Sequence, residues 1–518
     1  MPAREVNKWL ITLSVMVPTL IEVLDTSVAN VALDHMRGSL SAGQEEVTWV
    51  LTSYLVANAV VIPMSGWLAR FMGRKRYLLA SLVLFTASSL LCGAATSLAE
   101  LILFRIVQGV GGGGLQPMSQ AILLETFPPH ERGMAMAIFG MGVVVGPILG
   151  PLLGGWLTDE MSWRWIFYIN LPIGILALFM NWAFVHDPEY MERRESGEQV
   201  DYVGLALLCL GIGSLQIVLD KGQTEDWFSS TYITALAAVA AVCLLALVFW
   251  ELRQERPILN LRVLKNRSFA MGNIFMFLGF FGFFGSIVLL PLFLQTLMGY
   301  TAFLAGVVLG PGGFFAVLVM PVVGKLTQRL DARMLIAFGM AVTAWSLFYM
   351  SGFTLHIDFA TAVTGRLIQG LGMPFFFVAV TFTTMASVPR EQMNNASSIY
   401  NLLRNLGGSF GVAFVTTLLS RRTQYHHSIL AEHMGPLNPG FNLRLDALAS
   451  HLAARLGEFA DTTGLALGAI YQELNRQAAS LAYADAFYIQ GWIFVGLIFF
   501  VWIMRRPPMG APSGGGGH

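Results

Sequence analysis

Charged side chains are scarce in this chain of 518 residues. They make up 12% of it, whereas a soluble domain carries about 25%. Lysine and arginine together number 31, and so do aspartate and glutamate, so the net charge is zero. This scarcity excludes a disordered protein, most soluble enzymes and a nucleic-acid partner.

Cysteines are also few, and the ATP-binding signature is missing. Cys92, Cys209 and Cys243 each lie in an apolar run. An odd and scattered set forms neither a disulfide framework nor a metal site, so we expect no metal and no cofactor. The phosphate-binding pattern G-x-x-x-x-G-K-[ST] does not occur. We therefore expect an ion gradient, rather than ATP, to supply energy.

Long apolar runs, by contrast, fill the chain, and 55% of its residues are hydrophobic. A helix needs about 20 apolar residues to cross a bilayer. Because backbone groups in hydrocarbon must bond internally, each such run is predicted to be a helix. The sequence thus predicts an all-α membrane protein with 14 spans, at 10–33, 47–69, 77–96, 100–124, 134–158, 164–185, 201–220, 230–251, 268–297, 303–325, 334–354, 361–386, 396–420 and 484–504.

An even number of spans places both termini on one side of the membrane. The termini and the loops on their side hold 20 lysines and arginines, whereas the short loops on the other side hold 3. The positive-inside rule then predicts cytoplasmic termini. The long segment 421–483 falls on the outer side, and its leucines approximate one face of an amphipathic helix.

Two stretches of the chain recur. Arg105–Gly111 matches Arg366–Gly372 at an offset of 261, and Pro63–Leu68 matches Pro321–Leu326 at an offset of 258. Many secondary transporters contain such a repeat around a central pathway. We therefore predict three regions: a six-helix bundle at 1–190, two inserted helices at 191–260, and a second six-helix bundle at 261–518.

Two acidic residues interrupt the first span. Glu22 and Asp25 are three residues apart, so both are expected on one side of the helix. A carboxylate at membrane depth is costly and is often functional, and burial favours its neutral form, as proton coupling requires. Arg105 in span 4 is expected to keep Asp25 ionised while the two are close. The alternatives are a permanent structural pair for Asp25 and a water-facing position for Glu22.

The fifth span carries a glycine at every fourth position from Gly142 to Gly154. Such a stripe allows a neighbouring helix to approach closely, and prolines between the glycines favour bending. Ordinary packing of small residues is the alternative. The motif consists of Gly146, Pro147, Gly150, Pro151, Gly154 and Gly155.

Taken together, four motifs resemble the major facilitator superfamily, and within it the 14-helix drug:proton antiporter group. They are Leu24-Asp25-Thr26 through Asn30-Val31-Ala32-Leu33, Gly66 through Gly73-Arg74-Lys75-Arg76, Arg105-x-x-Gln108-Gly109, and the glycine–proline motif of span 5. The chain departs from the superfamily pattern at Arg70, where an aspartate that latches the loop is usual.

The resemblance implies a multi-pass protein of the bacterial inner membrane with the major facilitator fold. It implies proton-driven export of hydrophobic or cationic drugs by alternating access, with span 5 packed across the two halves. A periplasmic adaptor protein and an outer-membrane channel are implied partners, although segment 421–483 could instead form a lid over the pore.

The resemblance also implies roles for particular residues. Proton coupling falls to Asp25, Glu22 and Arg105. The expected substrate cavity comprises Asn30, Gln108, Gln116, Arg366, Gln369, Asn401 and Arg404. The expected cytoplasmic gating loop comprises Gly66, Arg70, Gly73, Arg74, Lys75 and Arg76.

Other functions stay open on the sequence alone. One is a proton-coupled transporter of a specific metabolite, lipid or siderophore. A symporter that imports a polar nutrient would have more polar residues in its cavity and no paired Gly-Pro helix. A membrane enzyme acting on lipid would need a nucleophile–base pair or a metal site, and no span carries one in its sequence.

Overall fold

The computed structural model describes residues 7–188, 200–255, 257–435, 437–456 and 461–503. Within these residues the regular structure is entirely helical. The helices of the N-terminal half are α1(Lys8–Val31), α2(Leu33–Ser39), α3(Gln44–Val47), α4(Trp49–Met72), α5(Arg74–Ala94), α6(Leu98–Gly112), α7(Leu115–Thr126), α8(Arg132–Glu160), α9(Trp165–Tyr168) and α10(Asn170–Phe184), with the short 3-10 helix η1(Pro129–Glu131).

The remaining helices form an inserted pair and a C-terminal half. The pair is α12(Tyr202–Lys221) and α13(Thr231–Arg253), with η2(Trp227–Ser229) between them. The C-terminal half comprises η3(Leu261–Lys265), α14(Arg267–Thr296), α15(Ala302–Leu326), α16(Ala332–Ser351), α17(Phe359–Ala386), η4(Arg390–Gln392), α18(Met393–Glu432), α19(Pro439–Leu456), α20(Thr462–Phe500) and η5(Val501–Ile503).

Fourteen helical segments of the described chain are long and apolar enough to cross a membrane. This confirms the predicted number of spans. The fourth span is interrupted, because Gly113 and Gly114 separate α6 from α7. A Cβ at Gly113 would lie 2.8 Å from the Asn58 carbonyl oxygen, so only glycine lets α4 approach this closely.

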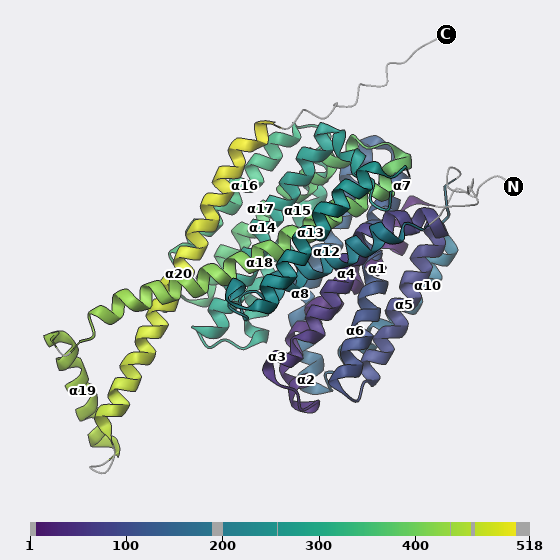
Figure 1. The fold of residues 1–518 in the computed structure, drawn as a ribbon. Helices are drawn as coiled ribbons and strands as arrows, with labels where there is room; N and C mark the ends of the chain where they lie inside the picture. The colour runs from purple at the N-terminus through teal and green to yellow at the C-terminus, as the bar shows by residue number, and fades with distance from the viewer. Residues whose placement is uncertain (1–6, 189–199, 256, 436, 457–460, 504–518) are drawn as a thin grey trace, which may run out of the picture.

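Helix α1 begins and α20 ends at the same end of the bundle (Figure 1). At this end the two halves pack tightly through matching contacts. A Cβ at Gly66 of α4 would lie 2.9 Å from the Asn395 Cα of α18, and one at Gly324 of α15 would lie 3.0 Å from the Gly133 oxygen of α8. Gly66 and Gly324 are related by the 258-residue offset of the repeat, so the interface shares the internal symmetry.

The inserted pair packs at the side of the bundle. Ile212 of α12 and Leu247 of α13 form a hydrophobic cluster with Ile62 of α4 and Leu406 of α18. The amide of Gln216 donates to the Ser409 hydroxyl over 3.0 Å. The pair therefore contacts both halves where α4 meets α18.

The segment 421–483 is largely helical, and two predicted span boundaries within it are wrong, because the helices of spans 13 and 14 do not stop at 420 and 484. The predicted helix at Leu443–Leu456 is present as part of α19. Helix α18 runs for 40 residues and α20 for 39, so both continue well beyond the bilayer, and α19 joins their far ends. We call α19 with the outer parts of α18 and α20 the helical arm. The arm projects away from the bundle at the end opposite the termini (Figure 1), and this rules out a lid over the pore in this arrangement.

Candidate functional site

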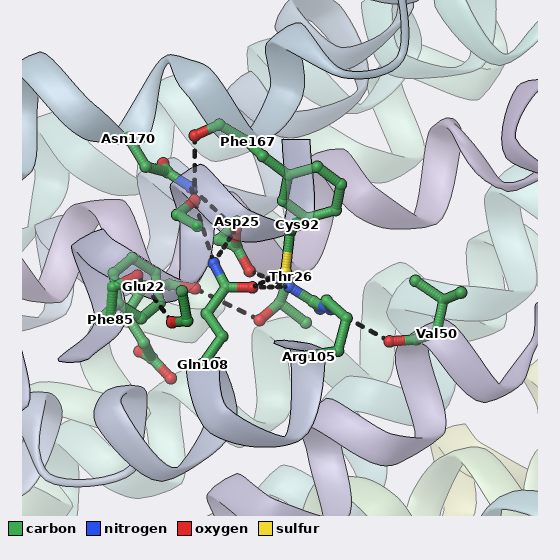
Figure 2. A network of polar contacts seen from close by, with 12 residues as sticks. Glu22, Asp25, Thr26, Val50, Phe85, Cys92, Arg105, Gln108, Phe167 and Asn170 are labelled. Carbon is green, nitrogen blue, oxygen red and sulfur yellow. Dashed lines mark hydrogen bonds and ion pairs between the residues drawn. The ribbon is translucent and has the colours of Figure 1, made fainter. Parts of the chain in front are cut away.

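Asp25 lies at the centre of a polar network that is closed to solvent (Figure 2). Its Oδ2 accepts a hydrogen bond from Arg105 Nη1 over 2.5 Å. Its Oδ1 accepts from Gln108 Nε2 over 2.9 Å and from Asn170 Nδ2 over 2.8 Å. We call these four residues the Asp25 site. The carboxylate is stabilised by one charge-assisted hydrogen bond, from the guanidinium, and by two hydrogen bonds from amides.

The guanidinium of Arg105 is equally enclosed, and its side chain is 0% exposed. Its Nε donates to the Val50 carbonyl over 3.1 Å, and its Cζ lies 4.2 Å from the centre of the Tyr54 ring. Phe167 lies further along the same side at 5.7 Å. A buried ion pair with this many contacts would be expensive to break by removing one partner.

Glu22 belongs to a second network. Its Oε1 accepts from Asn58 Nδ2 over 3.1 Å, and its Oε2 accepts from Gln116 Nε2. The Gln116 oxygen in turn accepts from Arg404 Nη2 of α18. We call Glu22, Asn58, Gln116 and Arg404 the Glu22 bridge, since it joins α1, α4 and α7 of one half to α18 of the other.

The structure bears differently on the alternatives for the two carboxylates. Glu22 is 5% exposed, so the water-facing alternative is wrong. Asp25 is paired to Arg105 as predicted, and this geometry is compatible both with a permanent pair and with one that separates during transport. The three-residue spacing did not bring both carboxylates into a common network, because they contact different helices.

The glycine stripe of α8 packs on α1, the helix that carries both carboxylates. A Cβ at Gly146 would lie 2.3 Å from Val23 Cγ1, and one at Gly150 would lie 2.1 Å from Ser27 Oγ. The stripe thus faces a helix of its own half. The contact of α8 with the other half is made by different residues, such as Gly133 against Gly324.

Other members of the span 5 motif have different surroundings. Pro147 lines a cavity that α8 shares with the C-terminal half, whereas a Cβ at Gly155 would meet nothing within 4 Å. Gly154 again contacts α1, through Val28. The side chain of Pro151 lies outside the described part of the structure.

The expected gating loop is almost absent, because Gly73 alone separates α4 from α5. Its φ of +88° is a conformation that suits glycine. Arg74 donates to Glu125 over 2.7 Å, and the backbone N–H of Lys75 donates to Asp187 Oδ1 over 2.7 Å. Asp187 thus supplies a carboxylate to this turn, whereas Arg70, in the place of the usual aspartate, donates to the Pro257 carbonyl over 3.0 Å. The side chain of the remaining member of the expected loop, Arg76, is exposed.

The residues expected in the substrate cavity fall into separate groups. Arg366 and Gln369 line a cavity of about 660 Å³, including the part open to solvent, between α8, α14, α15 and α17. Asn401 donates to Gln120 of α7 over 2.6 Å, a second polar contact between the halves. Asn30 is exposed near the end of α1 and joins neither the Asp25 site nor the Glu22 bridge.

Sequence reasoning missed several polar residues of these networks. Asn170 and Asn58 are single amides in largely apolar runs, and Ser89 follows Thr86 and Ser88 in another. Ser89 accepts from both Gln108 and Asn170. A lone amide or hydroxyl at membrane depth needs a hydrogen-bond partner. That requirement is a signal that could have identified them, although not their partners.

A helical repeat around buried, paired charges defines a membrane transporter rather than a soluble enzyme. The sequence profile described as Major Facilitator Superfamily matches residues 15–412. The chain belongs to this superfamily and is a multi-pass protein of the bacterial inner membrane.

Named relatives match the chain over almost its whole length. It is 38% identical over 518 residues to the Multidrug export protein EmrB of Escherichia coli strain K12, covering 100% of this chain and 99% of the relative. It is 38% identical to the Fatty acid resistance protein FarB of Neisseria gonorrhoeae, covering 98% and 97%. A crystal structure of a double-tryptophan XylE mutant shares the fold, with a TM-score of 0.62 at 14% identity and 96% coverage of each chain.

Proposed function

We propose that this transporter exports hydrophobic or cationic toxic compounds across the inner membrane in exchange for protons. The observation that carries the proposal is a carboxylate, Asp25, buried within a span against Arg105. A carboxylate in this position can carry one proton per cycle if its surroundings change between two states. The names of the relatives, which refer to multidrug export and fatty acid resistance, support a toxic cargo.

The cycle follows from the contacts. With the halves packed as described, Asp25 is paired with Arg105 and closed off, so it exchanges no proton with water. When the halves rock, the contact of Gln116 with Arg404 breaks and α1 becomes free to shift against α6. That shift lengthens the Arg105 contact and gives the carboxylate access to the outer side. It binds a proton there and releases it inside, while the cargo moves outward through the space between the halves. Cytoplasmic termini, as the distribution of lysine and arginine predicts, give the cycle this direction.

Transport into liposomes tests the function directly. The full chain is reconstituted, and uptake of a cationic dye such as ethidium is followed under an imposed proton gradient. We expect accumulation that an uncoupler abolishes. Uphill accumulation that persists after the gradient has collapsed, with no other ion gradient present, would contradict proton coupling. Transport of one metabolite only, with no transport of drug-like compounds, would favour the alternative of a transporter for a specific metabolite.

We further propose that the helical arm contacts a periplasmic adaptor protein, which passes cargo to an outer-membrane channel. The arm stands clear of the bundle, and its exposed face includes Leu443, which is 72% exposed, and Tyr471, which is 56% exposed. Exposed apolar and aromatic side chains on a projecting segment support its role as an interaction surface.

Deletion of residues 425–480 separates the arm from the pump. We expect dye transport in liposomes to change by less than about twofold, since the arm contacts neither the Asp25 site nor the Glu22 bridge. Resistance of cells carrying the deletion should fall to the level of cells without the transporter. Unchanged resistance would show that the arm is dispensable.

A further inference from the structure

The two halves contain the same arginine–glutamine pair in different chemical settings. In the N-terminal half Arg105 Nη1 donates to Gln108 Oε1, and Gln108 Nε2 donates to Asp25. In the C-terminal half Arg366 Nη1 donates to Gln369 Oε1, and Gln369 Nε2 donates to the hydroxyl of Ser286 over 2.6 Å. Ser286 is related to Asp25 by the same offset of 261 that relates the two arginines.

The aromatic cover of the arginine is also missing from the C-terminal half. A Cβ at Gly109 would lie 2.6 Å from the Tyr54 carbonyl oxygen, and one at Gly370 would lie 2.0 Å from the Gly312 carbonyl oxygen. These matching contacts place Gly312 where the N-terminal half has Tyr54, whose ring covers Arg105. Because Gly312 has no side chain, no ring from this position covers the guanidinium of Arg366, and Arg366 borders an open space.

That space is the cavity between the halves. Arg366, Gln369 and Gly312 all line it. The rest of its wall is apolar and comes from α8, α14, α15 and α17, including Phe280, Phe284 and Met373. The cavity therefore combines one cationic group with a largely hydrophobic wall.

Arg366 has no carboxylate of its own in the described part of the chain. No ion pair joins it to an acidic residue there, and its Nε is enclosed without a hydrogen-bond partner. A guanidinium in an apolar site is stabilised by an anion, and its planar fork suits the two oxygens of a carboxylate. In the N-terminal half Asp25 supplies this anion, so in the C-terminal half a ligand can supply it.

We propose that the C-terminal half binds an amphiphilic carboxylate, with its head group on Arg366 and Gln369 and its tail along the apolar wall of the cavity. Ser286 lies behind Gln369 and holds its amide in place. This inference rests on the proposed export function for its role as cargo. The site itself is a binding property that can be measured without transport. It adds organic acids with apolar tails to the range of hydrophobic and cationic compounds proposed above.

Three probes with the same ten-carbon tail test the head-group preference. Binding of labelled decanoate to the full chain in lipid nanodiscs, with empty nanodiscs subtracted, is displaced by unlabelled decanoate, decanol or decyltrimethylammonium. We expect decanoate to displace at concentrations about tenfold to hundredfold lower than decanol, since charge-assisted hydrogen bonds are the strong ones. Equal displacement by all three probes would overturn the proposal.

Substitutions at Ser286 and Arg366, with a control at Ser268, separate the effect of charge from an effect on the fold. Ser286→Asp supplies an internal anion and reproduces the N-terminal arrangement, so the preference for decanoate over decanol should vanish. Arg366→Gln should have the same effect, whereas Arg366→Lys should retain part of the preference because it keeps the charge. Ser268→Asp, on the first turn of the same helix, is the matched control and should bind like wild type. A preference that survives Ser286→Asp, in protein that melts like wild type, would also overturn the proposal.

Dye transport distinguishes this inference from the function it rests on. If ethidium is pumped but decanoate shows no preference, the carboxylate site is wrong and the export function stands. If decanoate shows its preference but no compound is pumped in liposomes, the site stands and the export function fails.

Discussion

The Asp25 site and the Glu22 bridge begin on the same helix, one turn apart, yet they belong to different mechanical units. Every hydrogen-bond partner of Asp25 lies within the N-terminal half, on α6 and α10. The Glu22 bridge reaches α18 of the C-terminal half through Gln116. A rigid rotation of one half against the other leaves the first set of contacts together and must break the second.

This difference assigns the two carboxylates different duties. The Asp25 site stores a charge that can be neutralised by a proton. The Glu22 bridge holds the halves together, so its strength sets how readily they separate. Because α1 carries both carboxylates, a small movement of this helix changes the contacts of both. Such a movement can link protonation of Asp25 to rocking of the halves.

The largest effect is expected from removing the charge at Asp25. Asp25→Asn keeps the shape but cannot bind a proton, so gradient-driven dye transport in liposomes should be abolished. Arg105 then lacks a counter-charge, and the free energy of unfolding should fall by about 3–5 kcal/mol, without preventing expression.

The double variant Asp25→Asn with Arg105→Gln is the matched control. It removes both charges, so it should recover most of the lost stability in a thermal-unfolding measurement while staying inactive. Wild-type transport in Asp25→Asn would remove this carboxylate from the mechanism. A double variant no more stable than the single one would mean that the pair is not energetically coupled.

A smaller effect is expected where α8 positions α1. Gly150→Ala places a methyl group 2.1 Å from Ser27 Oγ, which is too close for contact, so α1 must shift. Overpacking of this kind costs about 1–3 kcal/mol, and dye transport should fall with it. Gly155→Ala, one turn on in the same helix, meets nothing within 4 Å and should leave stability and transport unchanged. Equal effects at the two positions would contradict close packing of α8 on α1 as the cause.

The spans and the repeat could be predicted because they are local signals. An apolar run of about 20 residues identifies a span wherever it occurs, and Arg105 and Arg366 stand in nearly identical heptapeptides. The partners of the carboxylates could not be predicted in the same way. A step of three residues turns a helix by about 300°, and the remaining 60° is enough to direct Glu22 and Asp25 to different helices.

The length of the helices in the helical arm is a second feature that could not be predicted from hydrophobicity. Residues 421–432 are largely polar, and loss of hydrophobicity alone predicts that span 13 ends at residue 420. The stretch nevertheless lacks glycine and proline, so nothing ends α18 at the bilayer surface. A polar sequence without glycine or proline can continue an existing helix at low cost, because the nucleus is already formed.

The smallest effect is expected at Glu22, and it tests the comparison most sharply. The hydroxyls of Ser65 and Ser398, one on each half, lie 2.9 Å apart. Cysteines at these two positions should form a disulfide while the halves are packed, in a background with Cys209 and Cys243 replaced by alanine. The rate of this cross-link therefore reports how much of the time the halves are together.

Glu22→Gln removes the charge from the bridge but keeps its shape. The Glu22 carboxylate attracts the Arg404 guanidinium of the other half across Gln116. Losing this attraction should cost the packed state about 1 kcal/mol, which shifts the equilibrium about fivefold away from the packed halves, so the cross-link should form more slowly. The same change at the exposed Glu160 should have no effect. Asp25→Asn could instead slow the cross-link while Glu22→Gln does not. The assigned roles would then be reversed, and the Asp25–Arg105 pair would be what holds the two halves together.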